Sequence, residues 1–160
     1  MLLLPLEEHA VRRVAQRMRD ADRREIYAAR WQDDDDQLAR EVVQRSRFGA
    51  VAALDDATPA AAIGACPLSP GVWSAWMFAT DDWPRVARPL TRWTRRVLMP
   101  AVAATGAHRV ECRSIAEHHV AHRWLEHLGA VREAVMPDCG KARETFHLFA
   151  WRLSDRQGQG

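Results

Sequence analysis

The sequence predicts a single α/β domain, and three observations support this. Apolar residues recur at helical spacing in the first third, short extended runs separated by turns fill the middle, and helix and strand patterns alternate toward the end. The chain has 160 residues, of which 48% are hydrophobic and 28% are charged. This length and composition suit one folded domain and exclude a disordered or collagen-like chain.

Local signals place each element in turn. The acidic run 33–36 would cap and stabilise the N-terminus of a helix. Pro84 suits the first turn of a long helix, where its missing N–H costs nothing, whereas Pro89 and Pro100 are expected to bend or shorten that helix. Gly129 suits the C-cap of a later helix. The expected strands are 2–6, 48–54, 60–67, 72–80, 108–114, 130–136 and 145–153, the expected helices are 7–19, 23–31, the segment around 38–43, 84–104 and 117–127, and 154–160 is a polar tail after a domain of residues 1–153.

Cysteine usage and hydropathy indicate where the protein works. Cys66, Cys112 and Cys139 leave one thiol over under any disulfide pairing, and no zinc spacing is present, so a reduced cytosolic environment without a metal site is expected. No stretch approaches the length of a membrane span, and the apolar N-terminus lacks the basic region of a signal peptide. We expect a cytoplasmic protein with no membrane partner.

The order of the elements resembles the GNAT acetyltransferase superfamily over nearly the whole chain. The most specific fragment is 121–130, AHRWLEHLGA, which is similar to the helix-then-strand segment of that superfamily ending in Leu-Gly-Phe. The resemblance implies a mixed, mostly antiparallel twisted sheet of six to seven strands with about four helices. The tryptophan in this fragment and the long proline-bearing helix before it look most like the GNAT-like proteins of tailed bacteriophages, including the family of internal virion protein A.

Two departures from the GNAT pattern argue against ordinary acetyl transfer. Active relatives bind the CoA diphosphate with a glycine-rich loop. The corresponding stretch 80–89 has no glycine, and it contains two aspartates, a tryptophan and two prolines. The position of the usual tyrosine proton donor is Leu125. The phage resemblance and these two departures together imply a virion-associated structural or assembly protein with a degenerate CoA site and no cofactor. Such a protein is expected in the cytoplasm of the bacterial host cell, with incorporation into the phage particle as a further possibility. There are two alternatives to this role: an acetyltransferase and, second, a small phage regulator of a host protein.

The first alternative is an acetyl-CoA-dependent N-acetyltransferase with a diverged cofactor loop. Glu111, on a predicted strand, is then the candidate general base, and His118 or His119 is a substitute whose unperturbed pKa lies near neutrality. His118, His119 and His122 could also form a metal-binding face, but no acidic or cysteine partner stands at a diagnostic spacing, so they are interpreted as surface histidines. The candidate cofactor-binding residues are Trp76, Met77, Phe78, Arg85 and Arg88.

Helical spacing also predicts a basic stripe on the long helix. Arginines recur there every three to four residues, which places them on one face. Such a stripe can hold CoA phosphates, touch nucleic acid or pair with an acidic protein surface, or it can simply be solvated. Because no nucleic-acid reading motif accompanies it, a protein partner is expected instead. The candidate partner-binding residues are Arg85, Arg88, Arg92, Arg96 and, as an exposed tryptophan, Trp73.

Overall fold

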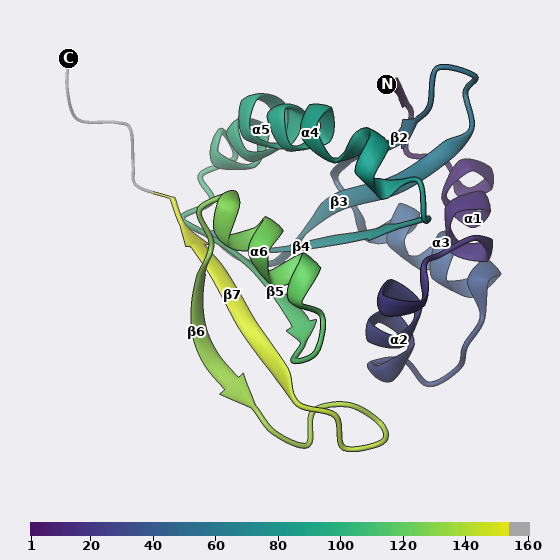
Figure 1. The fold of residues 1–160 in the computed structure, drawn as a ribbon. Coiled ribbons are helices and arrows are strands. Elements are labelled where there is room, and N and C mark those ends of the chain that lie inside the picture. Colours follow the sequence, from purple (N-terminus) through teal and green to yellow (C-terminus); the bar gives the residue numbers. More distant parts are fainter. Residues whose placement is uncertain (154–160) are drawn as a thin grey trace, which may run out of the picture.

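The computed structural model describes residues 1–153, so the predicted tail 154–160 lies outside the described residues. Its centre is a seven-stranded sheet in the order β1-β2-β3-β4-β5-β7-β6, in which only β4 and β5 are parallel (Figure 1). This confirms the predicted fold class. The elements are β1 (Leu2–Leu4), α1 (Glu8–Gln16), α2 (Asp20–Ala28), α3 (Asp35–Arg45), β2 (Phe48–Ala53), β3 (Pro59–Ser69), β4 (Val72–Ala79), α4 (Trp83–Trp93), the π-helix η1 (Thr94–Leu98), α5 (Met99–Ala103), β5 (Arg109–Ile115), α6 (His119–His127), β6 (Val131–Met136) and β7 (Phe146–Arg152).

Most boundaries follow the local signals in the sequence. Asp34 caps α3 as the acidic run predicts, because its carboxylate accepts the N–H groups of Asp36 and Gln37, each at 2.9 Å. Gly129 follows α6 with φ +93°, a conformation that favours glycine. Pro89 stands inside α4 without ending it, whereas Pro100 lies in the first turn of α5, directly after the segment that divides the long helix. The π-helical turn η1 within it has no counterpart in the sequence prediction.

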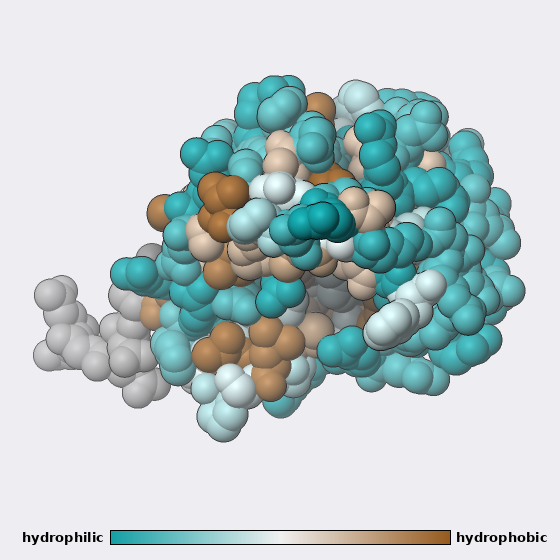
Figure 2. Space-filling model, turned by 90° about the horizontal axis from the view of Figure 1, so that it is seen from below, coloured by the Kyte–Doolittle hydropathy of each residue, from teal (hydrophilic) through white to brown (hydrophobic). Residues whose placement is uncertain are grey.

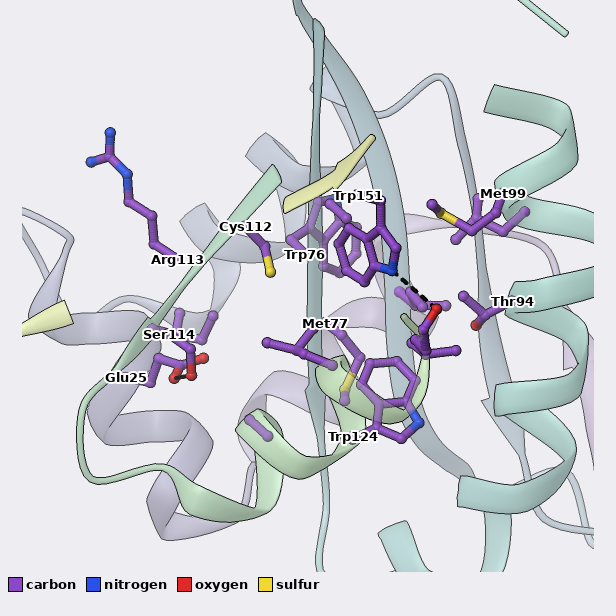
Figure 3. Close-up of a pocket in the computed structure, with 17 residues that line it drawn as sticks. Glu25, Trp76, Met77, Thr94, Met99, Cys112, Arg113, Ser114, Trp124 and Trp151 are labelled. Carbon is purple, nitrogen blue, oxygen red and sulfur yellow. Dashed lines mark hydrogen bonds between the residues drawn. The ribbon is translucent and has the colours of Figure 1, made fainter. Parts of the chain in front are cut away.

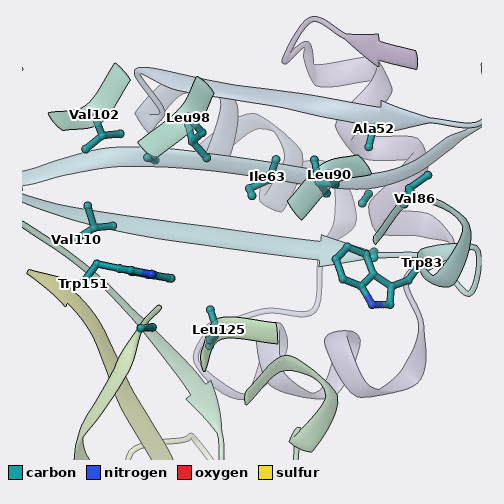
Figure 4. Packing of buried hydrophobic residues seen from close by; sticks show 14 of the residues in the cluster. Ala52, Ile63, Trp83, Val86, Leu90, Leu98, Val102, Val110, Leu125 and Trp151 are labelled. Carbon is teal, nitrogen blue, oxygen red and sulfur yellow. The ribbon is translucent and has the colours of Figure 1, made fainter. Parts of the chain in front are cut away.

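Two layers of helices cover the two faces of the sheet (Figure 1). On one face, α4, η1, α5 and α6 pack their apolar side chains against β2–β5 and β7, where residues such as Val86, Leu90 and Val102 are fully buried (Figure 4). On the other face, α1, α2 and α3 cover the middle of β2, β3 and β4 around Val11, Val14 and Phe78. Burial of these apolar side chains on both sides holds the strands in place.

The parallel strands β4 and β5 pair over a short distance only. Three pairs join them, from Val72↔Arg109 to Ser74↔Glu111. Beyond these pairs the two strands separate, while β4 stays paired with β3 as far as Ala79 and β5 stays paired with β7 as far as Ile115. The sheet is therefore open along one line, and this gap positions the candidate site.

Candidate active site

The gap exposes main-chain groups that an intact sheet would pair. The Thr80 N–H donates to the Ala60 carbonyl on β3, so by the alternation of an antiparallel ladder Met77 and Ala79 direct their N–H and C=O groups toward β5. On β5, the Ile115 N–H faces the gap in the same way, because it bonds to α2 and not to β7. No bond from the Met77 main chain across the gap is found in residues 1–153. A free peptide donor and acceptor therefore remain inside the gap.

Helix α2 closes the open end of the gap with two carboxylates three residues apart. Asp22 accepts the Ala79 N–H of β4 at 2.6 Å through Oδ2. Glu25 accepts the Ile115 N–H of β5 at 2.8 Å through Oε2. Residues three apart on a helix lie on the same face, so one face of α2 serves both strands. The two side chains replace the pairing that β4 and β5 do not make.

A cavity of about 110 Å³ lies in the gap and reaches from α2 to the helices on the opposite face (Figure 3). Glu25 and Ser114 lie at one end of the view, and Thr94 and Met99 lie at the other. Figure 2 shows the molecule hollowed on the side seen from below, with apolar residues beside the hollow and hydrophilic residues over most of the remaining surface. The lining is mainly apolar and consists of Glu25, Ile26, Ile63, Ala75, Trp76, Met77, Thr94, Leu98, Met99, Cys112, Arg113, Ser114, Ala121, Trp124, Leu125, Leu128 and Trp151.

Glu25 is the carboxylate of this cavity. Its Oε2 atom accepts from the Ser114 hydroxyl at 2.6 Å as well as from the Ile115 amide, and its Oε1 atom makes no hydrogen bond within residues 1–153. Burial raises the pKa of Glu25 above its usual range, although the Ser114 hydrogen bond acts in the opposite direction. Burial also raises the pKa of the neighbouring Cys112 thiol, which therefore stays protonated and is a poor nucleophile. The one group of the cavity suited to accept a proton is thus Glu25.

Asp22 is held more tightly than Glu25. Its Oδ1 atom lies 2.5 Å from His118 Nε2 and 2.9 Å from Arg19 Nε, and the residue is 3% exposed. His118 Nδ1 accepts the Ala121 N–H at the start of α6, so both ring nitrogens of His118 are in use. Asp22 thereby links α2, β4 and α6 in one buried network. The contacts of Asp22 therefore hold these elements of the fold together.

The predicted catalytic residues are not brought together. Glu111 bonds to Arg109 at 2.9 Å and does not line the cavity. His119 is exposed, as expected of a surface histidine. For His118 and His122 that interpretation is wrong, because they are 4% and 8% exposed and His122 bonds to the Ile115 carbonyl. No local sequence signal marks Glu25, because its partners lie 89 and 90 residues further along the chain.

The predicted cofactor residues of β4 divide between the two faces of the strand. Met77 lies on the face covered by α4 and α6, whereas Trp76 and Phe78 lie on the face covered by α1 and α3, where their rings stack. Trp76 and Met77 both line the cavity, and Phe78 is fully buried in the core. A second hollow of about 250 Å³ lies beside α3 and shares Trp76 and Ile26 with the cavity. The Trp76 indole lies against Gly64, where an added Cβ would come within 2.6 Å of the ring, so this strand position requires glycine. The indole of Trp76 therefore stands between two hollows.

The basic stripe lies in a groove of about 600 Å³ between α4, η1 and the end of α6. Arg85 lies outside it and pairs with Asp82 at 3.1 Å. Trp73 is 4% exposed and stacks on Phe48, so the prediction that its side chain is exposed is wrong. The alternation of β4 turns its side chain into the core. The groove is lined by Ala87, Arg88, Thr91, Arg92, Arg95, Arg96 and His127.

At the N-terminus of α4, the amides are already used inside the protein. The Asp82 N–H donates to Thr80 Oγ1 at 3.2 Å and the Trp83 N–H donates to the Thr80 carbonyl at 3.0 Å. Arg85 donates its N–H to the Asp82 carbonyl, and Pro84 has none. Leu125, at the position of the usual tyrosine, lines the cavity.

Residues 1–153 contain neither a cluster of metal-ligating side chains nor a helix that could span a membrane. No group of three or more His, Cys, Asp or Glu side chains in this range is arranged to hold a metal ion. Each helix in the same range is too short or too polar to span a membrane.

Comparison with known proteins identifies the fold. No protein-family model and no curated protein sequence matches the chain. Among solved structures, a GNAT-family acetyltransferase from Bacillus anthracis matches with TM-score 0.69 and 13% identity, covering 94% of this chain and 93% of that one. The ribosomal-protein-S18-alanine N-acetyltransferase from Escherichia coli matches with TM-score 0.65 and 15% identity, covering 96% and 93%. A putative acetyltransferase from Salmonella typhimurium, solved with its cofactor acetyl-CoA, matches with TM-score 0.62 and 14% identity over 83% of each chain.

These matches show that the chain has the GNAT fold, and they correct the leading functional expectation. Similar structures that cover most of the chain are acetyltransferases, so the expectation of a non-catalytic virion protein is contradicted. One of these structures contains acetyl-CoA, and the expectation that no cofactor binds therefore has no support. None of the three points to a phage-specific family. That expectation was based on the glycine-free loop and on Leu125. Neither feature closes the gap between β4 and β5.

Proposed function

We propose that this chain, whose fold is that of the GNAT acetyltransferases, transfers an acetyl group from acetyl-CoA to a primary amine. The observation that carries the proposal is the gap between β4 and β5, where an apolar cavity, the unpaired main chain of Met77 and the Glu25 carboxylate adjoin one another. The similarity to a structure with acetyl-CoA supports the donor. The amine acceptor is supported by the named activity of the Escherichia coli enzyme.

The residues of the cavity fit the thioester end of acetyl-CoA. Its lining is mainly apolar, which suits an acetyl group and the slender arm that carries it. Bound there, acetyl-CoA would supply a carbonyl carbon that a neutral amine can attack. The new C–N bond would replace the C–S bond, and coenzyme A would leave as a thiolate that takes a proton from solvent and is released as the free thiol. The Met77 N–H can donate to an oxygen placed in the gap, as backbone donors do at sites of developing negative charge. The amides at the N-terminus of α4 do not fit a diphosphate, because they are bonded within the protein.

Glu25 has the properties required of the proton acceptor. A general base works best when its pKa lies close to the working pH, and burial moves the pKa of Glu25 in that direction. Its free Oε1 atom accepts the proton from the amine, while Ser114 and Ile115 hold Oε2 in place. The apolar walls limit the entry of water to the reacting groups.

The proposal is tested by incubating the protein with acetyl-CoA and a panel of primary amines, including polyamines, amino acids and peptides, and measuring release of free thiol. Thiol release that depends on an amine is expected. Ala75→Leu places a larger side chain in the cavity and should reduce turnover by about a hundredfold by displacing the donor.

Ala134→Leu on β6 is the matched control, because this half-buried alanine does not line the cavity. Its turnover should match that of the unmodified protein, and thermal unfolding should show that both variants are folded. Absence of amine-dependent thiol release across the panel would contradict the proposal. Full turnover in a folded Ala75→Leu variant would contradict the assignment of the cavity.

A further inference from the structure

We infer that the groove between α4, η1 and α6 binds the phosphate-bearing nucleotide end of acetyl-CoA, with Arg88, Arg92, Arg95 and Arg96 as its anion ligands. The inference rests on the proposed function and adds a location that the α4 N-terminus does not provide. It depends on three properties of the groove: its unbalanced charge, its position beside the cavity and the chemistry of its side chains.

The charge of the groove is not balanced within the described part of the protein. All four arginines are exposed, and none forms an ion pair with a carboxylate of residues 1–153. Other arginines in this range do pair with acids, for example Arg30 with Glu41 and Arg109 with Glu133. The lining of the groove contains no Asp or Glu. Such a concentration of like charge favours a bound anion.

The groove lies beside the cavity. Trp124 lines the cavity and Thr91 lines the groove, and the Trp124 indole N–H donates to the Thr91 hydroxyl at 2.8 Å between them. Two successive residues of η1 also face the two hollows, because Thr94 lines the cavity and Arg95 lines the groove. One layer of side chains therefore separates the two. An arm that leaves the cavity past Trp124 delivers its far end to the arginines.

The chemistry of the groove matches that end of the molecule. Coenzyme A carries a diphosphate and a further phosphate on its ribose, and guanidinium groups bind phosphate oxygens through paired, charge-assisted hydrogen bonds. The alternative location, the start of α4, has its amides occupied and places the Asp81 and Asp82 carboxylates where phosphates would lie. The arginine groove is the nearby surface with free donors and positive charge.

The experiment measures binding by isothermal titration calorimetry and does not depend on turnover. The ligands are coenzyme A, S-acetylpantetheine, which lacks all phosphates, and a short single-stranded oligonucleotide. The variant is Arg92→Gln with Arg96→Gln, two side chains that make no hydrogen bond within residues 1–153. The control is Arg13→Gln with Arg40→Gln, which removes two exposed charges of α1 and α3 that form no ion pair within residues 1–153.

The unmodified protein should bind coenzyme A, and the groove variant should bind it roughly tenfold more weakly or worse, because each charge-assisted bond is worth about that factor. Binding of S-acetylpantetheine should be equal in all three proteins, and added salt should weaken coenzyme A binding less in the groove variant. Equal coenzyme A binding by both double variants overturns the inference and leaves the proposed function standing. If the unmodified protein binds neither coenzyme A nor S-acetylpantetheine, the inference and the proposed function are both overturned. If the oligonucleotide alone binds in a way that depends on the groove, the groove is assigned to nucleic acid and the inference is overturned.

Discussion

Asp22 and Glu25 occupy one face of α2 and perform the same local task, since each accepts a main-chain N–H at one side of the gap. Their surroundings differ. Asp22 contacts the cationic Arg19 and the ring of His118, whereas within residues 1–153 Glu25 accepts only from neutral donors and keeps one oxygen without a hydrogen bond. Burial without a cationic partner raises the pKa of Glu25. The same chemical group on one helix therefore serves as an anchor at one position and as a candidate base at the other.

The largest expected effect is on catalysis at Glu25. Glu25→Gln keeps the acceptor oxygen for Ser114 and Ile115 but cannot take a proton, so kcat/KM should fall by roughly 10²- to 10⁴-fold. Stability should be retained, because the substitution removes a buried charge without removing its hydrogen bonds. Steady-state kinetics and urea denaturation of the same preparation check both expectations.

Glu111→Gln is the control for this substitution, because Glu111 is the base that the sequence alone suggested. Since Glu111 does not line the cavity, kcat/KM should change by no more than about twofold, in keeping with the modest worth of its ion pair with Arg109. A larger loss in Glu111→Gln than in Glu25→Gln would show that the base has been assigned to the wrong residue.

The next effect is on stability at Asp22. Asp22→Asn leaves Arg19 without its carboxylate and turns one acceptor of the network into a donor, so the free energy of unfolding should fall by roughly 3 kcal/mol. Urea denaturation measures it. Asp33→Asn, at an exposed pair with Lys141, makes the same chemical change and should cost less than about 1 kcal/mol. Equal losses at the two positions would contradict the role of Asp22 as an anchor.

The smallest effect is a displacement of the pH profile. Glu25 accepts a proton only when ionised, so kcat/KM falls as the pH drops through its pKa. The Ser114 hydroxyl lowers that pKa by stabilising the carboxylate. Ser114→Ala should therefore raise the pKa of Glu25 and move the acid limb of the profile to higher pH, whereas Ser69→Ala, at an exposed position, should leave the profile in place. An unchanged or lowered acid limb in Ser114→Ala would mean that another group sets it.

The helices and strands could be predicted from the sequence because their signals are local. The acidic run before α3, the glycine after α6 and the alternation in β4 each act within a few residues. The candidate base could not be predicted in this way. Glu25 sits among other polar residues of α2, and only the packing of α2 against β5 distinguishes it from its neighbours.

Two errors of interpretation have the same origin. Spacing alone predicts that His118 and Trp73 lie at the surface, whereas His118 is held by a carboxylate 96 residues away and Trp73 stacks on a residue of another strand. Spacing predicts which residues share a face of an element but not which face meets the core when both faces are covered. This sheet has helices on both sides, so the ambiguity applies to much of it.

The indole of Trp76 has a consequence for the size of the transferred group under the proposed function. It is held flat against Gly64 and tethered to the Ser46 hydroxyl at 2.8 Å, and it stands between the cavity and the hollow beside α3. A smaller residue at this position would merge the two spaces. The length of acyl chain that the enzyme accepts would then be governed by one side chain, and Trp76→Ala should shift preference from acetyl toward longer acyl donors.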